Sequence, residues 1–143
     1  MKRLATLIAV CLLAAFGAQA IAAGKPVTIG TRTTALGTFL VSGGHTLYLF
    51  EADSRNQSTC SGPCAGTWPP LLTSARPKAS GAVRAGLLGT IRSGSSLQVT
   101  YAGHPLYTYS GDTRRGDVNS QNLKLFGAKW FVVGTAGAAI TKP

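Results

Sequence analysis

Apolar residues in this chain fall in short runs that alternate with polar residues, and turns containing glycine separate the runs. Helical periodicity is nearly absent beyond residue 24, and β-branched and aromatic side chains are common in the runs. The pattern predicts strands at 27–29, 38–41, 46–50, 88–91, 97–101, 106–109 and 130–133. With 18 glycines available for tight turns, the sequence predicts an all-β fold of antiparallel strands.

One segment of the chain occurs twice. Residues 44–55 return as residues 103–114 without a gap, and six of the twelve aligned positions are identical. A repeat of this kind signals a duplicated structural unit, and units this small cannot bury a core alone. We therefore expect a single antiparallel β domain, residues 24–143, in which two related units pack about a pseudo-twofold axis. The first unit spans about 36–72 and the second about 88–134.

Each unit is predicted to contain a hairpin followed by an aromatic strand. The turns lie at 42–44 and 102–103, where glycine permits a tight connection. Because side chains alternate along a strand, the aromatic residues after each turn share one face and the leucines lie on the other. The aromatic pairs are Tyr48 with Phe50 and Tyr107 with Tyr109. Trp68 and Trp130 follow, one in each unit, and are expected to anchor the core.

Residues 1–23 have the features of a secretory signal. Two basic residues precede an apolar run at 4–16, and the small residues Ala18 and Ala20 offer a cleavage site. The run is too short to span a bilayer, so we expect export to the periplasm or beyond, with no transmembrane segment in the mature chain. Cys11 follows Val10 rather than a small residue, and we interpret it as part of the signal, not as a lipid-anchored cysteine.

The chain is strongly basic. It carries 14 lysines and arginines against four aspartates and glutamates, a formal net charge of +10. Removal of Lys2 and Arg3 with the signal leaves 12 basic and four acidic residues, a net charge of about +8. This balance favours an anionic partner, either an envelope component or an acidic protein. The basic residues are scattered and accompany no nucleic-acid-binding motif, so we do not expect nucleic acid as a partner.

The repeated segments carry the motif Tyr-x-aromatic-x-x-Asp, at 48–53 and at 107–112. Cys60, Cys64 and a Trp-Pro-Pro-Leu segment at 68–71 follow the first copy. With these features the chain resembles the bacterial secreted repeat proteins and predicted lipoproteins that this motif defines, over nearly the whole mature sequence. The resemblance implies export and no particular activity, since the role of that family is unassigned. Its members are often lipid-anchored, whereas this chain lacks the sequence context that such an anchor requires.

The motif aspartates admit two interpretations. Asp53 and Asp112 lie just past their strands, where a carboxylate accepts hydrogen bonds from the free backbone N–H groups of a turn. The aromatic residues of the motif would then supply buried area. The alternative pairs the two aspartates across the axis, as acid proteases do. Arg55 and Arg114 stand where that signature has glycine, so we prefer the structural interpretation.

The two mature cysteines also admit two interpretations. Export and an even number of thiols favour a disulfide between Cys60 and Cys64 that fastens the loop before Trp68. The alternative makes both sulfurs copper ligands together with His45 or His104, because soft thiolates select Cu(I). No thioredoxin-like βαβ pattern accompanies these cysteines. We therefore expect the disulfide, and neither a metal nor another cofactor.

Familiar catalytic motifs are missing from the sequence. It has no Gly-x-Ser-x-Gly elbow, no His-Glu-x-x-His and no phosphate-binding glycine loop. We therefore expect a protein that is not an enzyme, namely an exported envelope protein that serves as a binding, accessory or structural module. The alternative is a periplasmic metal-handling protein built on Cys60, Cys64 and one of the two histidines.

Overall fold

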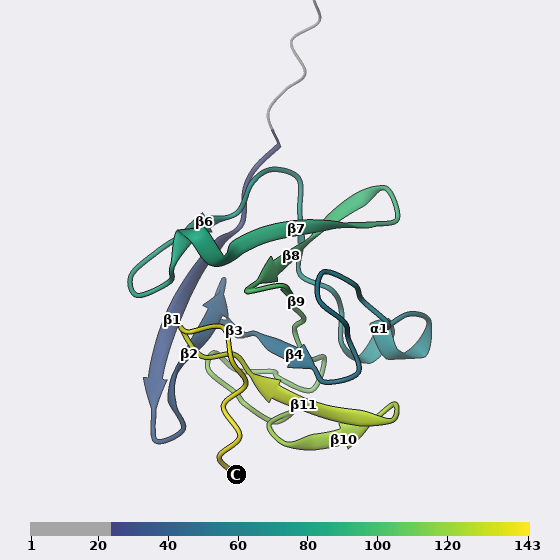
Figure 1. The fold of residues 1–143 in the computed structure, drawn as a ribbon. Coiled ribbons are helices and arrows are strands. Elements are labelled where there is room, and N and C mark those ends of the chain that lie inside the picture. The colour runs from purple at the N-terminus through teal and green to yellow at the C-terminus, as the bar shows by residue number, and fades with distance from the viewer. Residues whose placement is uncertain (1–23) are drawn as a thin grey trace, which may run out of the picture.

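The computed structural model of the chain describes residues 24–143, which form mostly short β-strands (Figure 1). The strands are β1 (Thr28–Thr34), β2 (Gly37–Ser42), β3 (His45–Thr46), β4 (Tyr48–Phe50), β5 (Leu72–Thr73), β6 (Lys78–Ala79), β7 (Leu88–Ser93), β8 (Ser96–Tyr101), β9 (His104–Pro105), β10 (Leu123–Leu125) and β11 (Ala128–Val132). A short helix, α1 (Pro63–Thr67), and a 3-10 turn at Ala85–Leu87 interrupt them. The predicted signal segment, with Cys11, lies outside the described residues.

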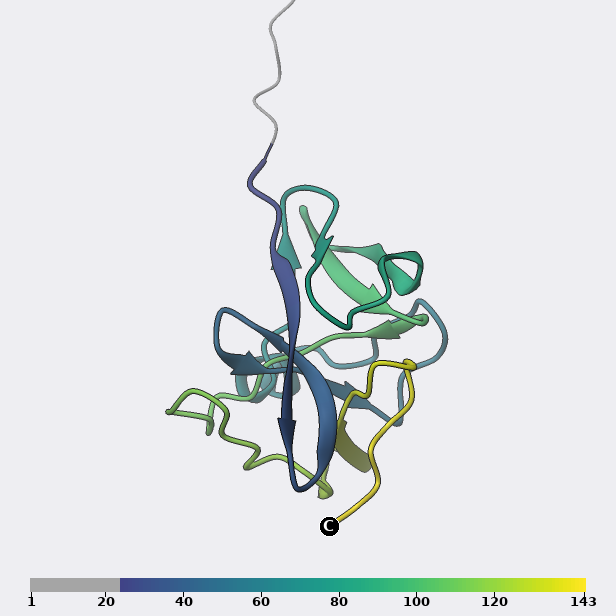
Figure 2. The ribbon, with the colours of Figure 1, turned by 90° about the vertical axis from the view of Figure 1, so that its left-hand side faces the viewer.

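The strands form three small sheets. Their orders are β3-β2-β1-β6, β10-β11-β4 and β5-β8-β7, and β9 pairs with β8 in the third sheet. Neighbouring strands are antiparallel except β1 and β6, which run parallel. The β7–β8 hairpin lies toward one end of the body and the β10–β11 hairpin toward the other, with the β1–β2 hairpin along one side (Figures 1 and 2). The predicted all-β, antiparallel fold is confirmed.

The hairpin turns β2–β3 and β8–β9 are the equivalent turns of the two repeats. The turn residues 43–44 have φ of 57° and 88°, and residues 102–103 have φ of 51° and 82°. Positive φ at both positions is the geometry of a type I′ hairpin turn. The second glycine of each turn also makes room for an arginine, because an added Cβ would lie 2.7 Å from Arg115 in the first and 2.8 Å from Arg55 in the second. The loop of each repeat thus closes over the turn of the other.

The end of each repeat pairs with the hairpin of the other repeat. The N–H of Leu40 in the first repeat donates to the carbonyl of Val133 in the second, at 2.9 Å. The N–H of Val99 in the second repeat donates to the carbonyl of Leu71 in the first, also at 2.9 Å. Each hairpin is therefore extended by the end of the other repeat, which is the relation that a pseudo-twofold axis produces.

The core divides into two clusters, one on each side of the motif strands. The first contains the leucines and valines, among them Leu40, Leu47, Leu49, Val99, Leu106 and Val133. The second contains the aromatic residues, among them Phe39, Tyr48, Phe50, Trp68, Tyr107 and Trp130. The predicted alternation of aromatic and leucine faces is confirmed, and both tryptophans are fully buried.

One predicted strand is not formed. Segment 106–109 contains no strand, although the equivalent strand of the first repeat, β4, pairs with β11. The segment lies opposite Pro69 and Pro70, and Pro70 forms an isolated bridge with Tyr107. A proline has no backbone N–H, so this pair of neighbours cannot complete a regular ladder.

Candidate functional site

The two motif tyrosines meet at the centre of the molecule. The N–H of Tyr48 donates to the carbonyl of Tyr107 at 2.9 Å, and the N–H of Tyr107 donates to the carbonyl of Tyr48 at 3.0 Å. This reciprocal pair joins the two motif segments in antiparallel orientation. Both tyrosines are fully buried, so the most similar parts of the two repeats form the middle of the core.

Each tyrosine hydroxyl binds the aspartate of the other repeat. Tyr48 Oη donates to Asp112 Oδ2 at 2.7 Å, and Tyr107 Oη donates to Asp53 Oδ2 at 2.6 Å. Burial, together with the neighbouring carboxylate, raises the pKa of both tyrosines well above the usual value, so both hydroxyls remain protonated donors. The tyrosine of each motif therefore pairs with the aspartate of the other motif. The spacing of tyrosine and aspartate within one motif does not reveal this pairing.

The second oxygen of each aspartate fixes the loop that follows it. Asp53 Oδ1 accepts hydrogen bonds from the N–H and the hydroxyl of Thr59, at 2.7 and 2.9 Å. Asp112 Oδ1 accepts one from the N–H of Asn119 at 3.0 Å. Burial raises the pKa of Asp112, against the opposing effect of its hydrogen bonds. Both carboxylates thus tie backbone N–H groups, and each is paired with a tyrosine rather than with the other carboxylate.

The aromatic residues form a continuous stack across the axis. Phe50 lies on Trp130 at 4.2 Å, Trp130 on Trp68 at 4.2 Å, and Trp68 on Tyr109 at 5.0 Å. The equivalent residues of the two repeats occupy equivalent places in this stack. Trp68 Nε1 donates to the hydroxyl of Ser120 at 2.8 Å, a contact that no sequence motif indicated. Because the central rings are buried, the stack packs the interior and offers no open face for a ligand.

Cys60 and Cys64 form the expected disulfide, with their Cα atoms 5.2 Å apart. Both sulfurs are buried against the cluster that contains Trp68. His45 is exposed at the start of β3, and His104 is half-buried at the start of β9. Within residues 24–143 no group of three or more His, Cys, Asp or Glu side chains could hold a metal ion. The structure therefore does not support the copper-binding alternative.

A hollow of about 450 Å³ lies beside the first motif strand. Its lining residues are Leu49, Phe50, Glu51, Asp53, His104 and Ala139. Burial lowers the pKa of His104, and Arg55 acts in the same direction, while the nearby Asp53 carboxylate opposes them. The lining includes no serine, cysteine or lysine that could act as a nucleophile.

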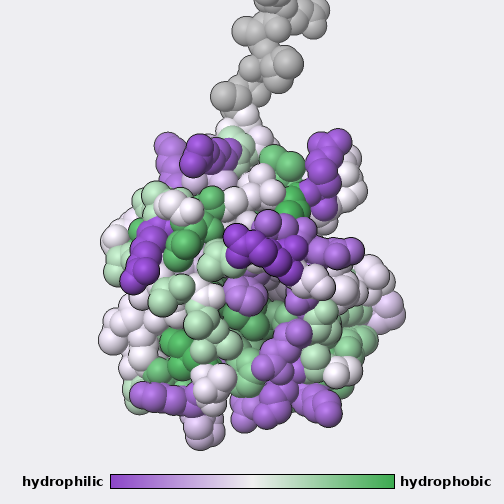
Figure 3. All heavy atoms as spheres, viewed as in Figure 1, coloured by the Kyte–Doolittle hydropathy of each residue, from purple (hydrophilic) through white to green (hydrophobic). Residues whose placement is uncertain are grey.

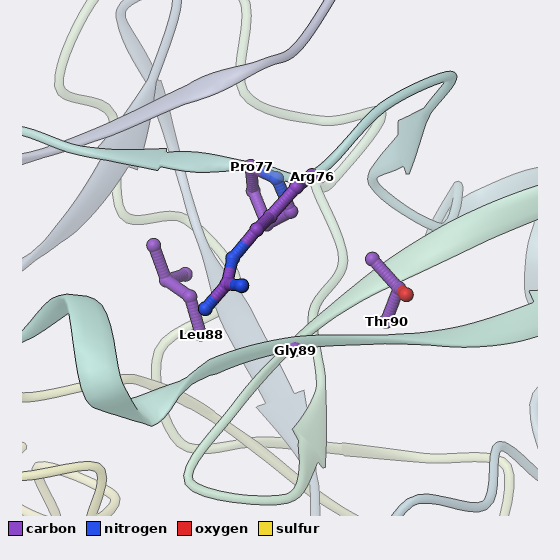
Figure 4. A pocket seen from close by; sticks show the side chains of 5 residues that line it. All are labelled: Arg76, Pro77, Leu88, Gly89 and Thr90. Atoms are coloured by element: carbon purple, nitrogen blue, oxygen red, sulfur yellow. The ribbon is translucent and has the colours of Figure 1, made fainter.

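A second hollow of about 330 Å³ lies between β7 and the connector, residues 73–84, which joins the two repeats. It is lined by Arg76, Pro77, Leu88, Gly89 and Thr90. Figure 4 shows the side chain of Arg76 extending across this hollow toward Leu88. Arg76 is the one charged residue of the lining, and its side chain points along the hollow rather than toward a second functional group.

Two surface features remain outside the duplicated motif. Among residues 24–143 the structure contains one ion pair, Arg114 with Asp117 at 4.0 Å, and backbone N–H groups lower the pKa of that aspartate. Three of the four exposed large apolar side chains in this part of the chain lie in segment 123–126. Sequence reasoning missed this segment, although Leu-Lys-Leu-Phe-Gly at 123–127 shows strand alternation ending in a turn residue.

Comparison with known families gives one match. A family model described as a secreted repeat of unknown function matches residues 30–72 and 91–134, and each matched segment contains one copy of the motif. No curated protein and no solved structure matches the chain. Neither helical segment of the described residues has the length and apolar character needed to cross a membrane.

Proposed function

We propose that this chain, which belongs to the family of secreted repeats of unknown function, is a non-enzymatic module that binds anionic material of the cell envelope. The family assignment makes it an exported protein. Two features of its charged groups support the rest of the proposal, namely the internal use of the aspartates and the exposure of the basic residues.

The aspartates are engaged in holding the fold. Asp53 and Asp112 each accept a tyrosine hydroxyl and a backbone N–H, and Asp117 accepts the N–H groups of Thr113 and Arg114. A general acid or base must exchange its proton with a substrate in an accessible position. Carboxylates committed to tyrosines and loop backbones are poorly suited to that work, and this supports a binding role over a catalytic one.

The observation that carries the proposal is the absence of partners for the positive charge. Residues 24–143 contain 12 lysines and arginines, yet their one ion pair within 4.0 Å belongs to a largely exposed arginine. Among the remaining cations, Arg55 donates to the Ala102 carbonyl, Arg115 packs against Gly44, and Lys129 lies over the ring of Phe131. Strongly hydrophilic side chains gather near the middle and at the margins of the face in Figure 3. A surface with this imbalance attracts polyanions and anionic membranes.

Binding to two anionic materials tests the proposal. The exported protein is mixed with vesicles containing phosphatidylglycerol and, separately, with an anionic polysaccharide, and the bound fraction is measured at two ionic strengths. Binding to at least one material should weaken by about tenfold or more between roughly 0.02 M and 0.2 M salt, because the Debye length shortens. Vesicles of phosphatidylcholine serve as the uncharged control. Equal retention on charged and uncharged material, or none at all, contradicts the proposal.

We propose further that residues 1–23, including Cys11, are removed on export, so that the mature protein carries no lipid at that cysteine. Mass spectrometry of the exported protein should then give the mass of a chain that begins near residue 24. A mass that includes Cys11 with attached acyl chains contradicts this part of the proposal.

A further inference from the structure

The β10–β11 hairpin has an apolar tip that is exposed. Leu123, Leu125 and Phe126 are 36%, 46% and 45% exposed, and only one other large apolar side chain among the described residues, Leu72, is comparably exposed. Single exposed apolar residues are ordinary, whereas a cluster at one place marks an interaction surface. The cluster belongs to the second repeat alone, since the first repeat has α1 and the disulfide in the corresponding loop.

Phe126 lies at this tip with a backbone conformation that is unfavourable for a bulky residue. Its φ is 56°, and Gly127 follows with φ of 90°, so the two residues form a type I′ turn closed by the Leu125–Ala128 pair. A bulky residue is disfavoured in this left-handed conformation, where asparagine and glycine are common. Phe126 makes one aromatic contact, an edge-to-face pair with the buried Trp68 at 6.0 Å, and this contact leaves 45% of its side chain exposed. An outlier of this kind points to a function for the side chain.

Two lysines stand behind the tip. Lys124 and Lys129 are direct partners across the hairpin, both are exposed, and neither has a carboxylate within 4.0 Å. Like charges directly opposite one another destabilise a two-stranded ribbon. An anion that binds between or beside them would remove that cost. The hairpin thus combines an apolar end with a pair of cations one residue behind it.

We propose that this hairpin inserts into the interface of an anionic phospholipid bilayer. Leu125 and Phe126 enter the boundary between headgroups and acyl chains, while Lys124 and Lys129 bind lipid phosphates. This inference rests on the proposed function and specifies its partner. A polysaccharide would leave the two apolar side chains without a use. A protein partner would need about 800 Å² of surface on each side for a stable complex, far more than three half-exposed side chains provide.

Substitution of Phe126 tests insertion without weakening the fold. Phe126→Asn removes the apolar side chain and places at φ of 56° a residue that accepts this conformation. Sedimentation with phosphatidylglycerol vesicles should show binding weakened by about tenfold or more, since the transfer of a Phe side chain out of water is lost. The melting temperature should change little, because relief of the strained backbone at residue 126 offsets the loss of the edge-to-face contact with Trp68. Leu72→Asn, which changes a side chain 44% exposed on β5, is the matched control and should bind as the unaltered protein does.

A charge-matched pair of variants tests the lysines. Lys124→Gln with Lys129→Gln removes two charges from the hairpin, and Arg84→Gln with Arg92→Gln removes two exposed charges elsewhere. At low salt the first variant should lose about tenfold or more in vesicle binding, because each lysine near an anionic surface contributes to attraction. The second should lose clearly less.

The outcomes separate this inference from the proposed function. If the protein binds anionic material in a salt-sensitive way and Phe126→Asn binds vesicles equally well, the hairpin is not the contact and the inference is overturned, while the proposed function stands. If the unaltered protein binds neither vesicles nor polysaccharide, both are overturned. If Phe126→Asn changes the oligomeric state and leaves vesicle binding as it was, the tip serves a protein contact and the inference is again overturned.

Discussion

The two repeats contribute equivalent motif residues to the core but differ in their strand pairing and in the loops that follow the motifs. In the first repeat the motif strand β4 pairs with β11 at three residue pairs, whereas the equivalent residues of the second lie against Pro69 and Pro70. The loop after Asp53 contains α1 and the disulfide, and the loop after Asp112 leads into the β10–β11 hairpin. The leucines and tyrosines that the repeats share are buried, and the exposed apolar tip belongs to a segment found in only one of them. Duplication has preserved the scaffold, and divergence of the loops has given the two halves different surfaces.

The two tyrosine–aspartate pairs differ as well. Asp112 is 7% exposed, while Asp53 is half-buried and keeps two hydrogen bonds from Thr59 in addition to that of its tyrosine. The same chemical pair therefore sits in a drier environment in one place than in the other. This difference can be measured, because a buried carboxylate that loses a partner has less access to water as a replacement.

Loss of either central tryptophan should have the largest effect. Trp68→Ala and Trp130→Ala should each lower the free energy of unfolding by about 3–5 kcal/mol, since each removes a large buried ring from the stack. Both substitutions remove an indole donor, but Trp68→Ala should cost more, because Ser120 is fully buried whereas Leu125, whose carbonyl accepts from Trp130, is exposed and can bind water instead. Denaturant unfolding of both variants checks the values. A loss below about 1 kcal/mol for either would show that the stack is not the main support of the aromatic cluster.

Removal of the tyrosine hydroxyls should reveal the difference between the two pairs. Tyr48→Phe leaves the buried Asp112 Oδ2 without a donor and should cost about 3 kcal/mol, although Oδ1 keeps the N–H of Asn119. Tyr107→Phe should cost about 1 kcal/mol because Asp53 retains both hydrogen bonds from Thr59 and contact with solvent. Unfolding by urea at pH 7 gives both values. Equal losses, or a larger loss for Tyr107→Phe, would mean that the environments of the two aspartates are energetically alike.

The disulfide should contribute less and act locally. Cys60→Ser with Cys64→Ser should lower the free energy of unfolding by about 2 kcal/mol, as expected for a short closed loop. Hydrogen exchange should become faster at 54–67 and stay unchanged at 113–127, the loop of the second repeat that has no cysteine. Faster exchange in both loops would show that the disulfide supports the whole domain.

The smallest effect should be the pH dependence that His104 confers. Its pKa in the folded protein lies below the ordinary value of 6.5, so the unfolded chain binds the proton more readily. Stability should therefore fall as the pH is lowered through this range, and His104→Gln should flatten the decline. His45→Gln, the equivalent change at an exposed position in the first repeat, is the control. A decline of the same slope in both variants would assign it to other groups.

Much of the scaffold can be predicted from the sequence because its signals are local. Alternation along 46–50 places aromatic and leucine side chains on opposite faces, and glycines mark both hairpin turns. The disulfide can be predicted because Cys60 and Cys64 are close in sequence and the chain is exported. The sequence also shows Pro69 and Pro70. Their effect, which is to prevent a regular strand at 106–109, can be predicted only if that segment is known to lie opposite them.

The candidate site could not be predicted in the same way, because its contacts join distant parts of the chain. Tyr48 and Asp112 are 64 residues apart, and the motif spacing suggests an aspartate of the same repeat instead. The apolar residues of segment 123–126 alternate as they would in a core strand, and only the fold shows that they remain exposed. Which tyrosine binds which aspartate, and whether segment 123–126 is covered by other residues, both depend on tertiary packing. A single sequence does not show that packing.

The crossing of tyrosines and aspartates has a consequence for how such a protein can arise and come apart. Neither repeat is complete by itself, since each contains a hydroxyl whose acceptor is on the other. The arrangement is that of a two-chain complex with pseudo-twofold symmetry, in which each half supplies the acceptor that the other half needs. The segment between the repeats joins the two halves in one chain, so that their association does not depend on concentration. It also contributes to the fold through the pairing of β6 with β1 and through Val83, which is buried in the core.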